Sequence, residues 1–267
     1  MSVLKLNENG GYGFQLKRLN GVIHPRGTGN GLFLEVNGTP ITRFGMCAIN
    51  LELYLSSSDR LRFFIPIVES YYEVDEGVLS VDFDDMDAWN IHTVLTYDFQ
   101  PDDCIDVTFD FKFSRGYGGF EAVVSSYFDE QYAPLLNVGQ EWIRPHFQPN
   151  EQLFFTRDDE ASVLMLDGRW DWLQNYGRCA NDDGRKYSLP VIVYRSESTK
   201  FVLIQMIELM RCPAISVNMF PIGQAFSLIG ENVSSGEQIS VRSRLLYREA
   251  ADLDAVTEWY EAWDTAR

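Results

Sequence analysis

The sequence is short of positive charge. Its 267 residues carry 22 Lys and Arg against 39 Asp and Glu, a net charge of −17, and its isoelectric point is near 4.5. A surface of that sign repels phosphate backbones and anionic lipids, so we expect neither nucleic acid nor a membrane as a partner. Cationic and neutral ligands stay open. High negative charge also keeps a protein soluble, so it does not by itself identify a ligand.

Long apolar runs are absent as well. No stretch reaches the roughly 18 apolar residues that a membrane-spanning helix needs. Residues 1–19 contain Asn, Glu, Gly and Lys in place of the apolar centre of a signal peptide. We therefore expect a cytoplasmic protein.

Motifs for metals and cofactors are missing too. The four cysteines form no Cys-x-x-Cys pair, which excludes zinc-ribbon spacing. We interpret them as free thiols and expect Cys47, Cys104 and Cys212, which have apolar neighbours, to be buried. The acidic residues between 82 and 87 lack the spacing of an EF-hand and indicate a solvated turn, and a Gly-x-Ser-x-Gly elbow does not occur. We expect no cofactor and no metal.

The sequence does contain a long alternating hairpin. In residues 105–113 every odd position is apolar and every even one is polar, and upstream Leu95, Tyr97 and Phe99 alternate with Val94, Thr96 and Asp98. A period of two places one set of side chains on each face of a sheet. Residues 100–103 (QPDD) supply turn chemistry between the two runs. An apolar sheet face needs a second layer to cover it, so the pattern predicts an all-β protein, a large two-sheet β-sandwich.

The rest of the chain continues this pattern. Asn20-Gly21 and Asn37-Gly38 are turn signals, and residues 129–150 are expected to form a long loop. Further strands are predicted along the chain, at residues 49–55, 61–72, 77–83, 120–128, 161–166, 190–194, 201–206, 214–218, 225–229 and 238–247.

Helical character is clear only at the C-terminus. Val256, Trp259, Tyr260 and Trp263 fall on one helical face, with Asp252 as a cap. We interpret this stripe as core packing by a short helix that covers the sandwich. No linker or repeat divides the sequence, so residues 1–267 are predicted to form a single domain.

The order of elements resembles the galactose mutarotase-like supersandwich, and uncharacterised bacterial members of that fold in particular. The similarity rests on residues 89–97 (WNIHTVLTY) with the strand that follows, on residues 120–128, and on residues 212–247 with FSLIG at 226–230. The resemblance implies a two-sheet fold shared with aldose epimerases. Those enzymes use a His general acid and a late carboxylate, but neither the His motif nor the context of Glu208, Glu231 or Glu237 matches. No catalytic residue is therefore carried over.

Three segments carry candidate site residues. The first is the loop segment QEWIRPHF, where His146 and Glu141 would exchange protons while Trp142 and Arg144 would bind a sugar. The alternative is a surface Arg–Glu pair with Trp142 filling a loop core. The second is the Gly-rich segment at 23–31, where His24 would be a proton shuttle and Arg26 an anion ligand, or where the glycines merely provide turn flexibility. This segment lacks the Lys-Ser/Thr ending of a phosphate-binding loop.

The third segment holds Trp170 and Trp172, which would share a face if the chain is extended there. Exposed, they would stack on sugar rings; buried, they would fill the sandwich. His92, near Trp89, is interpreted as a packing residue.

Together these features predict a carbohydrate-binding or carbohydrate-active protein. The partner would be a mono- or oligosaccharide, and the chemistry epimerisation at an anomeric carbon or acid/base cleavage, with His as first candidate because its pKa lies near neutrality. The competing hypothesis is a non-catalytic interaction or assembly protein on the same fold. Convergence of His24, His146 and Glu141 in one pocket would favour the enzyme.

Overall fold

Two sheets make up the computed structural model. It describes residues 3–6, 10–24, 30–43, 45–57, 62–64, 70–83, 89–146, 148, 150–196, 199–218 and 223–266. The strands are β1 (Val3–Leu6), β2 (Tyr12–Gln15), β3 (Leu19–Ile23), β4 (Leu32–Val36), β5 (Thr39–Pro40), β6 (Asn50–Ser56), β7 (Arg62–Phe64), β8 (Ser70–Asp75), β9 (Val78–Phe83), β10 (Ile91–Gln100), β11 (Cys104–Phe113), β12 (Tyr117–Ser126), β13 (Ala133–Val138), β14 (Glu141–Ile143), β15 (Glu151–Thr156), β16 (Cys179–Arg195), β17 (Phe201–Ile207), β18 (Ala214–Asn218), β19 (Gly223–Val233) and β20 (Gln238–Glu249). The helices are α1 (Asp159–Met165), α2 (Asp254–Thr265) and the 3₁₀ turns η2 (Asp171–Tyr176) and η3 (Leu209–Arg211).

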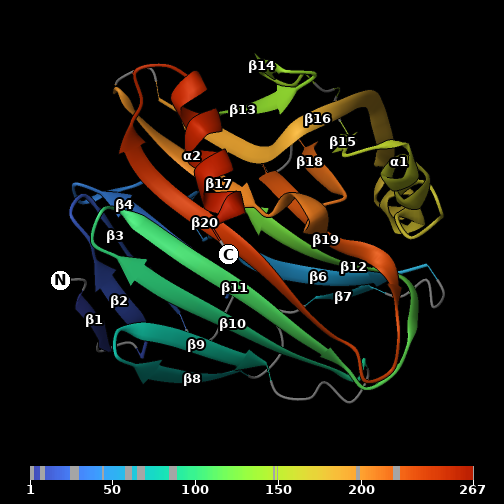
Figure 1. Ribbon diagram of the computed structural model, residues 1–267, viewed down its shortest axis with the longest axis horizontal. Helices are drawn as coiled ribbons and strands as arrows, with labels where there is room; N and C mark the ends of the chain where they lie inside the picture. The colour runs from blue at the N-terminus through green and yellow to red at the C-terminus, as the bar shows by residue number, and fades with distance from the viewer. Residues whose placement is uncertain are drawn as a thin grey trace.

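The large sheet folds back on itself to form two layers. Its strands run in the order β7-β6-β12-β19-β18-β15-β16-β17-β20-β11-β10-β9-β8. The long strand β16 pairs in parallel with β15 through its first half and antiparallel with β17 through its second half. It therefore joins the layer that contains β12 to the layer that contains β11, as Figure 1 shows. The smaller sheet, β1-β2-β3-β4-β5, lies beside them at the N-terminal end.

The central hairpin matches the sequence prediction. β10 and β11 pair from Ile91 opposite Phe113 to Gln100 opposite Cys104, and the alternating apolar side chains are buried. Asp103 closes the turn with a positive φ of 57°. Its buried carboxylate accepts the N–H groups of Arg18 and Leu19 at 2.6 and 2.9 Å. The turn thus ties the hairpin to the N-terminal sheet.

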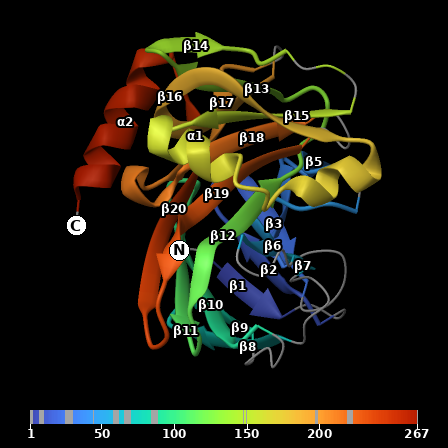
Figure 2. The same ribbon diagram turned by 90° about the vertical axis from the view of Figure 1, so that its right-hand side faces the viewer.

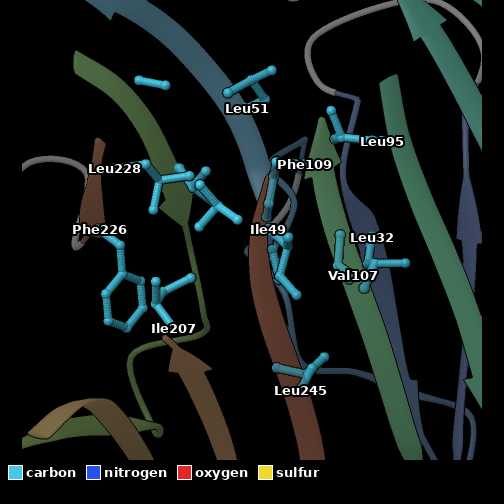
Figure 3. Close-up of a cluster of buried hydrophobic side chains, with 14 of the residues drawn as sticks. Leu32, Ile49, Leu51, Leu95, Val107, Phe109, Ile207, Phe226, Leu228 and Leu245 are labelled. Carbon is cyan, nitrogen blue, oxygen red and sulfur yellow. The ribbon is translucent and has the colours of Figure 1, made fainter. Parts of the chain in front are cut away.

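The main core fills the space between the two layers. Figure 3 shows Phe226 and Leu228 of β19 and Leu51 of β6 on one side, with Val107 and Phe109 of β11 on the other. Polar bridges cross this core, among them a hydroxyl pair between Tyr54 on β6 and Thr93 on β10 at 2.5 Å. The hydroxyl of Ser126 on β12 donates to Oε1 of Gln205 on β17 at 2.7 Å, and both side chains are fully buried. The fold class predicted from alternation is therefore confirmed.

Three local predictions were wrong. Residues 161–166, expected as a strand, belong to α1, because the carboxylate of Asp158 accepts the Ala161 N–H at 2.8 Å and caps a helix. The loop expected at 129–150 contains the hairpin β13–β14. Asn20 and Gly21 lie inside β3, where a Cβ on Gly21 would come within 2.3 Å of the Phe33 carbonyl, so this glycine serves close packing between strands. The Asn37-Gly38 turn between β4 and β5 is confirmed.

The C-terminal helix packs on the sandwich as expected. α2 buries Val256, Tyr260 and Trp263 against an apolar cluster on the outer side of β16, β17 and β20 (Figure 1). Asp252 accepts the Ala255 N–H at 3.1 Å, which confirms the predicted cap. All four cysteines are free thiols, and Cys47, Cys104 and Cys212 are buried.

Candidate functional site

One outer sheet face combines polar and charged side chains in an unusual way. Ser126 of β12 points into the core, so its neighbours Ser125, Val123 and Glu121 point outward. Residues directly opposite on antiparallel strands share a face. Ser125 is opposite Ala225, which is opposite Ser216, which is opposite Phe154. We call the face that carries these side chains the β12 face; it also includes Leu53, Leu55, Ala214 and Ser227.

A carboxylate and a phenol meet at one end of this face. Glu52 is the extra residue of a β-bulge in β6, because Val123 pairs with Leu53 while Val124 pairs with Leu51. Its Oε2 accepts the hydroxyl of Tyr127, which follows β12, at 2.8 Å. Both side chains are half-buried. Burial raises the pKa of the Tyr127 phenol, and the Glu52 carboxylate raises it further, so Tyr127 stays a proton donor at neutral pH.

A second carboxylate lies fully buried on the same face. Oε2 of Glu121 accepts the indole N–H of Trp170 at 3.2 Å and lies 3.5 Å from the Arg169 guanidinium. Its Oε1 has no hydrogen-bond partner among the described residues. Burial raises the pKa of the Glu121 carboxyl, although Arg169 acts in the opposite direction.

Arg169 is held in place from two sides. It pairs with Asp167 through Nε at 3.0 Å and Nη2 at 2.7 Å. Its guanidinium also packs on Gly119, where a Cβ would come within 2.4 Å of Nη2 and where φ is +57°. A side chain at position 119 would therefore displace the arginine. Arg169 neutralises charge inside the site and has no room to reach a ligand elsewhere.

An apolar segment covers the Glu121 end of the β12 face. Met165 of α1, Trp170 and Leu173 of η2 pack on apolar residues of this face, which are Leu53, Leu55, Val123, Phe154, Ala214 and Ala225. α1 faces the viewer in Figure 2, in front of β18 and β19. Trp170 is only 5% exposed, so the buried alternative holds for this residue and an exposed sugar platform does not. The extended geometry expected for 170–172 is also wrong, since η2 begins at Asp171; the side chain of Trp172 lies outside the described part.

The predicted loop site is dispersed on the surface. Glu141, Arg144 and His146 are exposed, on β14 or just after it. Trp142 is half-buried and packs on the apolar cluster beneath α2. Among the described residues, no hydrogen bond or ion pair joins Glu141 to His146, and their assignment as acid and base stays a prediction.

The other two histidines lie elsewhere. His24 follows β3, half-buried, with its ring edge-on to Phe33 at 5.1 Å, and its carbonyl accepts the Tyr72 hydroxyl at 3.1 Å. Arg26 lies outside the described residues. His92 pairs with Asp82 at 2.8 Å on β9 and β10. In both ribbon views the end of β3 and β14 lie in different parts of the molecule, so His24 does not converge with His146 and Glu141 (Figures 1 and 2). All three histidines are described, and none lies on the β12 face.

Sequence reasoning missed the β12 face entirely. Glu121 offered one signal, because it is the lone charge in the otherwise apolar or small run FEAVVSSYF at 120–128. Glu52 and Tyr127 gave none, since they are 75 residues apart and meet only across the strand pair. Within the described residues, no group of His, Cys, Asp and Glu is arranged to hold a metal ion. Nor does any helix there combine the length and apolarity needed to cross a membrane.

Comparisons with known proteins place the fold. No protein-family model matches the chain, and no curated protein sequence does. Among solved structures, a candidate aldose 1-epimerase from Escherichia coli K12 matches with a TM-score of 0.57 and 9% identity, over 90% of this chain and 99% of that one. Another candidate aldose 1-epimerase, from Klebsiella pneumoniae, matches with a TM-score of 0.53 and 9% identity, over 99% of this chain and 88% of that one. A heparan sulfate lyase from Pedobacter heparinus matches with a TM-score of 0.53 and 10% identity, over 94% of this chain and 37% of that one. The chain therefore has the galactose mutarotase-like fold that the sequence pattern predicted.

Proposed function

We propose that this protein, a chain of the galactose mutarotase-like fold, binds a neutral carbohydrate at the Glu52–Tyr127 end of the β12 face. The 2.8 Å contact between these two half-buried groups carries the proposal. A carboxylate accepts two or more hydrogen bonds, and a phenol held in its protonated form can donate one and accept another. Sugar hydroxyls offer the complementary donors and acceptors.

The neighbouring side chains suit the same ligand class. Ser125, Ala225 and Ser216 are small and buried, and Gln152 Nε2 donates to the Ser216 hydroxyl at 3.2 Å, so Glu52 and Tyr127 are left as the groups that contact the ligand. The charge also fits, because the half-buried Glu52 carboxylate would repel an anionic ligand. The fold adds support: solved structures that share it include candidate aldose epimerases and a polysaccharide-cleaving lyase. Fold alone does not assign a reaction.

Acid/base chemistry on the sugar would use the same pair. The Glu52 carboxylate would accept the proton of a sugar hydroxyl, and Tyr127 would hold or return a proton at the neighbouring oxygen. This is the carbohydrate-active form of the proposal. The second candidate, non-catalytic binding, is favoured by one observation: His24, His146 and Glu141 do not converge.

A saccharide screen tests the proposal. Neutral mono- and oligosaccharides are screened by thermal shift, and each hit is titrated against wild type, Glu52→Gln and Tyr127→Phe. Loss of a hydrogen bond to a charged group costs about 1.5–3 kcal/mol, so each substitution should weaken binding by about 10- to 150-fold. Glu73→Gln and Tyr71→Phe are matched controls, because both residues are exposed on β8, far along the sheet.

The result also separates the two forms of the function. An anomerisation assay by NMR is run on each hit; turnover that disappears in Glu52→Gln supports the enzyme, and binding without turnover supports the non-catalytic protein. If both site variants bind as the controls do, the β12 face is not the site, and the exposed residues at 141–146 become the next candidate.

A further inference from the structure

A groove between α2 and the sheet carries positively charged side chains, in contrast to the carboxylates of the β12 face. It encloses about 450 Å³ and is lined by residues of β11, β20 and α2. Its charged lining residues are Asp106 and three arginines, Arg242, Arg244 and Arg248. The arginines project from one face of β20 toward Trp259 and Trp263 of α2. In a protein with a net charge of −17, this concentration of guanidinium groups is a local exception.

Two of the arginines are occupied by internal contacts. Arg244 forms a bidentate pair with Asp106 at 2.6 and 2.7 Å. Arg242 reaches Glu208 at 3.4 Å and donates to the Ala266 and Asp264 carbonyls at the end of α2, at 3.0 and 3.4 Å. The Arg242 contacts hold the end of α2 on the sheet, and the Arg244–Asp106 pair joins β20 to β11, so both arginines have structural roles.

Arg248 differs from both. Its guanidinium lies over the Trp259 ring, 5.0 Å from the centroid, and is exposed. It forms no hydrogen bond or ion pair with any described residue. A guanidinium stacked on an indole keeps its N–H groups directed outward in the ring plane, which is the geometry for bidentate recognition of an oxyanion.

We propose that this groove binds a small ligand through a carboxylate or sulfate group held by Arg248 over Trp259. The volume suits a ligand of about monosaccharide size. The net charge of the chain disfavours a long polyanion, whose other charges would face the acidic surface. The proposal is independent of the sugar site on the β12 face, which lies on the other layer of the sandwich.

Calorimetric titration with three probes tests this site. Glucuronate carries the oxyanion on a sugar ring, glucose carries the ring alone, and inorganic sulfate carries the anion alone. In Glu52→Gln, which lacks the proposed neutral-sugar site, glucuronate or sulfate should bind at least about tenfold more tightly than glucose. Binding should weaken between about 0.01 and 0.1 M salt, as the Debye length falls from about 30 to 10 Å. If glucuronate binds more tightly than sulfate, the ligand of the groove is a sugar acid. If sulfate binds more tightly than glucuronate, the ligand is a free inorganic anion.

Variants connect the binding to the groove. Arg248→Gln should lose the bound anion by at least about tenfold, and Arg248→Lys, which keeps the charge without the planar fork, should bind at an intermediate strength. Arg195→Gln is the matched control, an exposed strand arginine outside the groove. The proposal is overturned if wild type binds neither anion, if glucose binds Glu52→Gln as tightly as glucuronate does, or if Arg248→Gln and Arg195→Gln bind the anions alike. Glu52→Gln should leave this binding intact, so failure here and failure of the sugar site are distinguishable.

Discussion

Truncation of Trp263 should lower the free energy of unfolding more than truncation of Trp259, the other tryptophan of α2. Trp263 is 6% exposed, lies edge-on to Tyr260 at a centroid distance of 5.9 Å, and has Arg242 and Arg244 over its ring at 5.3 and 5.8 Å. Buried Trp→Ala substitutions cost about 3–5 kcal/mol. The cation–π contacts contribute about 1 kcal/mol within that figure. We therefore expect Trp263→Ala to lower the free energy of unfolding by about 4 kcal/mol.

Trp259 provides the comparison. It lies one turn earlier on the same stripe, but it is only half-buried and borders the groove. The sequence pattern alone predicts the full cost of a buried tryptophan for it. The structure lowers the expected cost of Trp259→Ala to about 2 kcal/mol, since part of the Trp259 side chain stays in contact with water in the folded state.

Thermal and urea unfolding followed by circular dichroism measure both variants. For a chain of this size, about 4 kcal/mol corresponds to a shift of about 10 °C in Tm. Met210→Ala is the control, because its side chain is 70% exposed, and it should change stability by no more than about 0.5 kcal/mol. A cost below about 1 kcal/mol for Trp263→Ala, or a larger cost for Trp259→Ala, would refute this account of how α2 packs.

Two further predictions concern the candidate residues. Burial raises the pKa of Glu121, so the protonated carboxyl is the form that favours folding. The contribution of this carboxyl to the free energy of unfolding is complete below the ordinary pKa of about 4.3. That contribution is lost as pH rises through the folded-state pKa. Glu121→Gln should remove that loss, so its urea midpoint should rise relative to wild type above pH 4.3 but not below it; the reverse trend would show that the ion pair with Arg169 dominates. Trp142→Ala should lower Tm measurably because Trp142 packs beneath α2, whereas His146→Gln should not, since His146 is exposed. If a saccharide ligand is found and His146→Gln lowers turnover, the loop assignment stands.

The sequence predicted best where one local period decided the structure. Buried and less buried side chains alternate over all ten residues of β10 and over residues 105–113 of β11, so the pairing of this hairpin followed from the pattern. α1 was missed because ASVLML at 161–166 is a short apolar run without a clear period. Its helical signals were the acidic residues just before it, Asp158, Asp159 and Glu160, which cap the helix and fill its first turn. The β13–β14 hairpin was missed because its turn, Gly139-Gln140, has positive φ at both positions without the usual Asn-Gly sequence.

The candidate site could not be predicted in the same way. Its contacts join distant parts of the chain: Glu52 meets Tyr127 across 75 residues, and Arg169 meets Glu121 across 48. Local patterns give no information on such pairs. Clusters of chemically active residue types that are close in sequence, such as 141–146, attracted attention instead, and the structure places them on a surface hairpin.

Charge separates the two proposed sites and constrains what each can bind. On the β12 face, the cation Arg169 is committed to Asp167 and Glu121, so it does not offset the charge of the Glu52 carboxylate. At that face a sugar acid would lose the hydration of its carboxylate and would be repelled by Glu52, whereas a neutral sugar would form hydrogen bonds. In the α2 groove the exposed Arg248 reverses this preference. A single sugar acid that bound both faces with equal strength would therefore contradict the electrostatics of the structure. Neutral sugar and glucuronate should occupy the protein together, each without displacing the other.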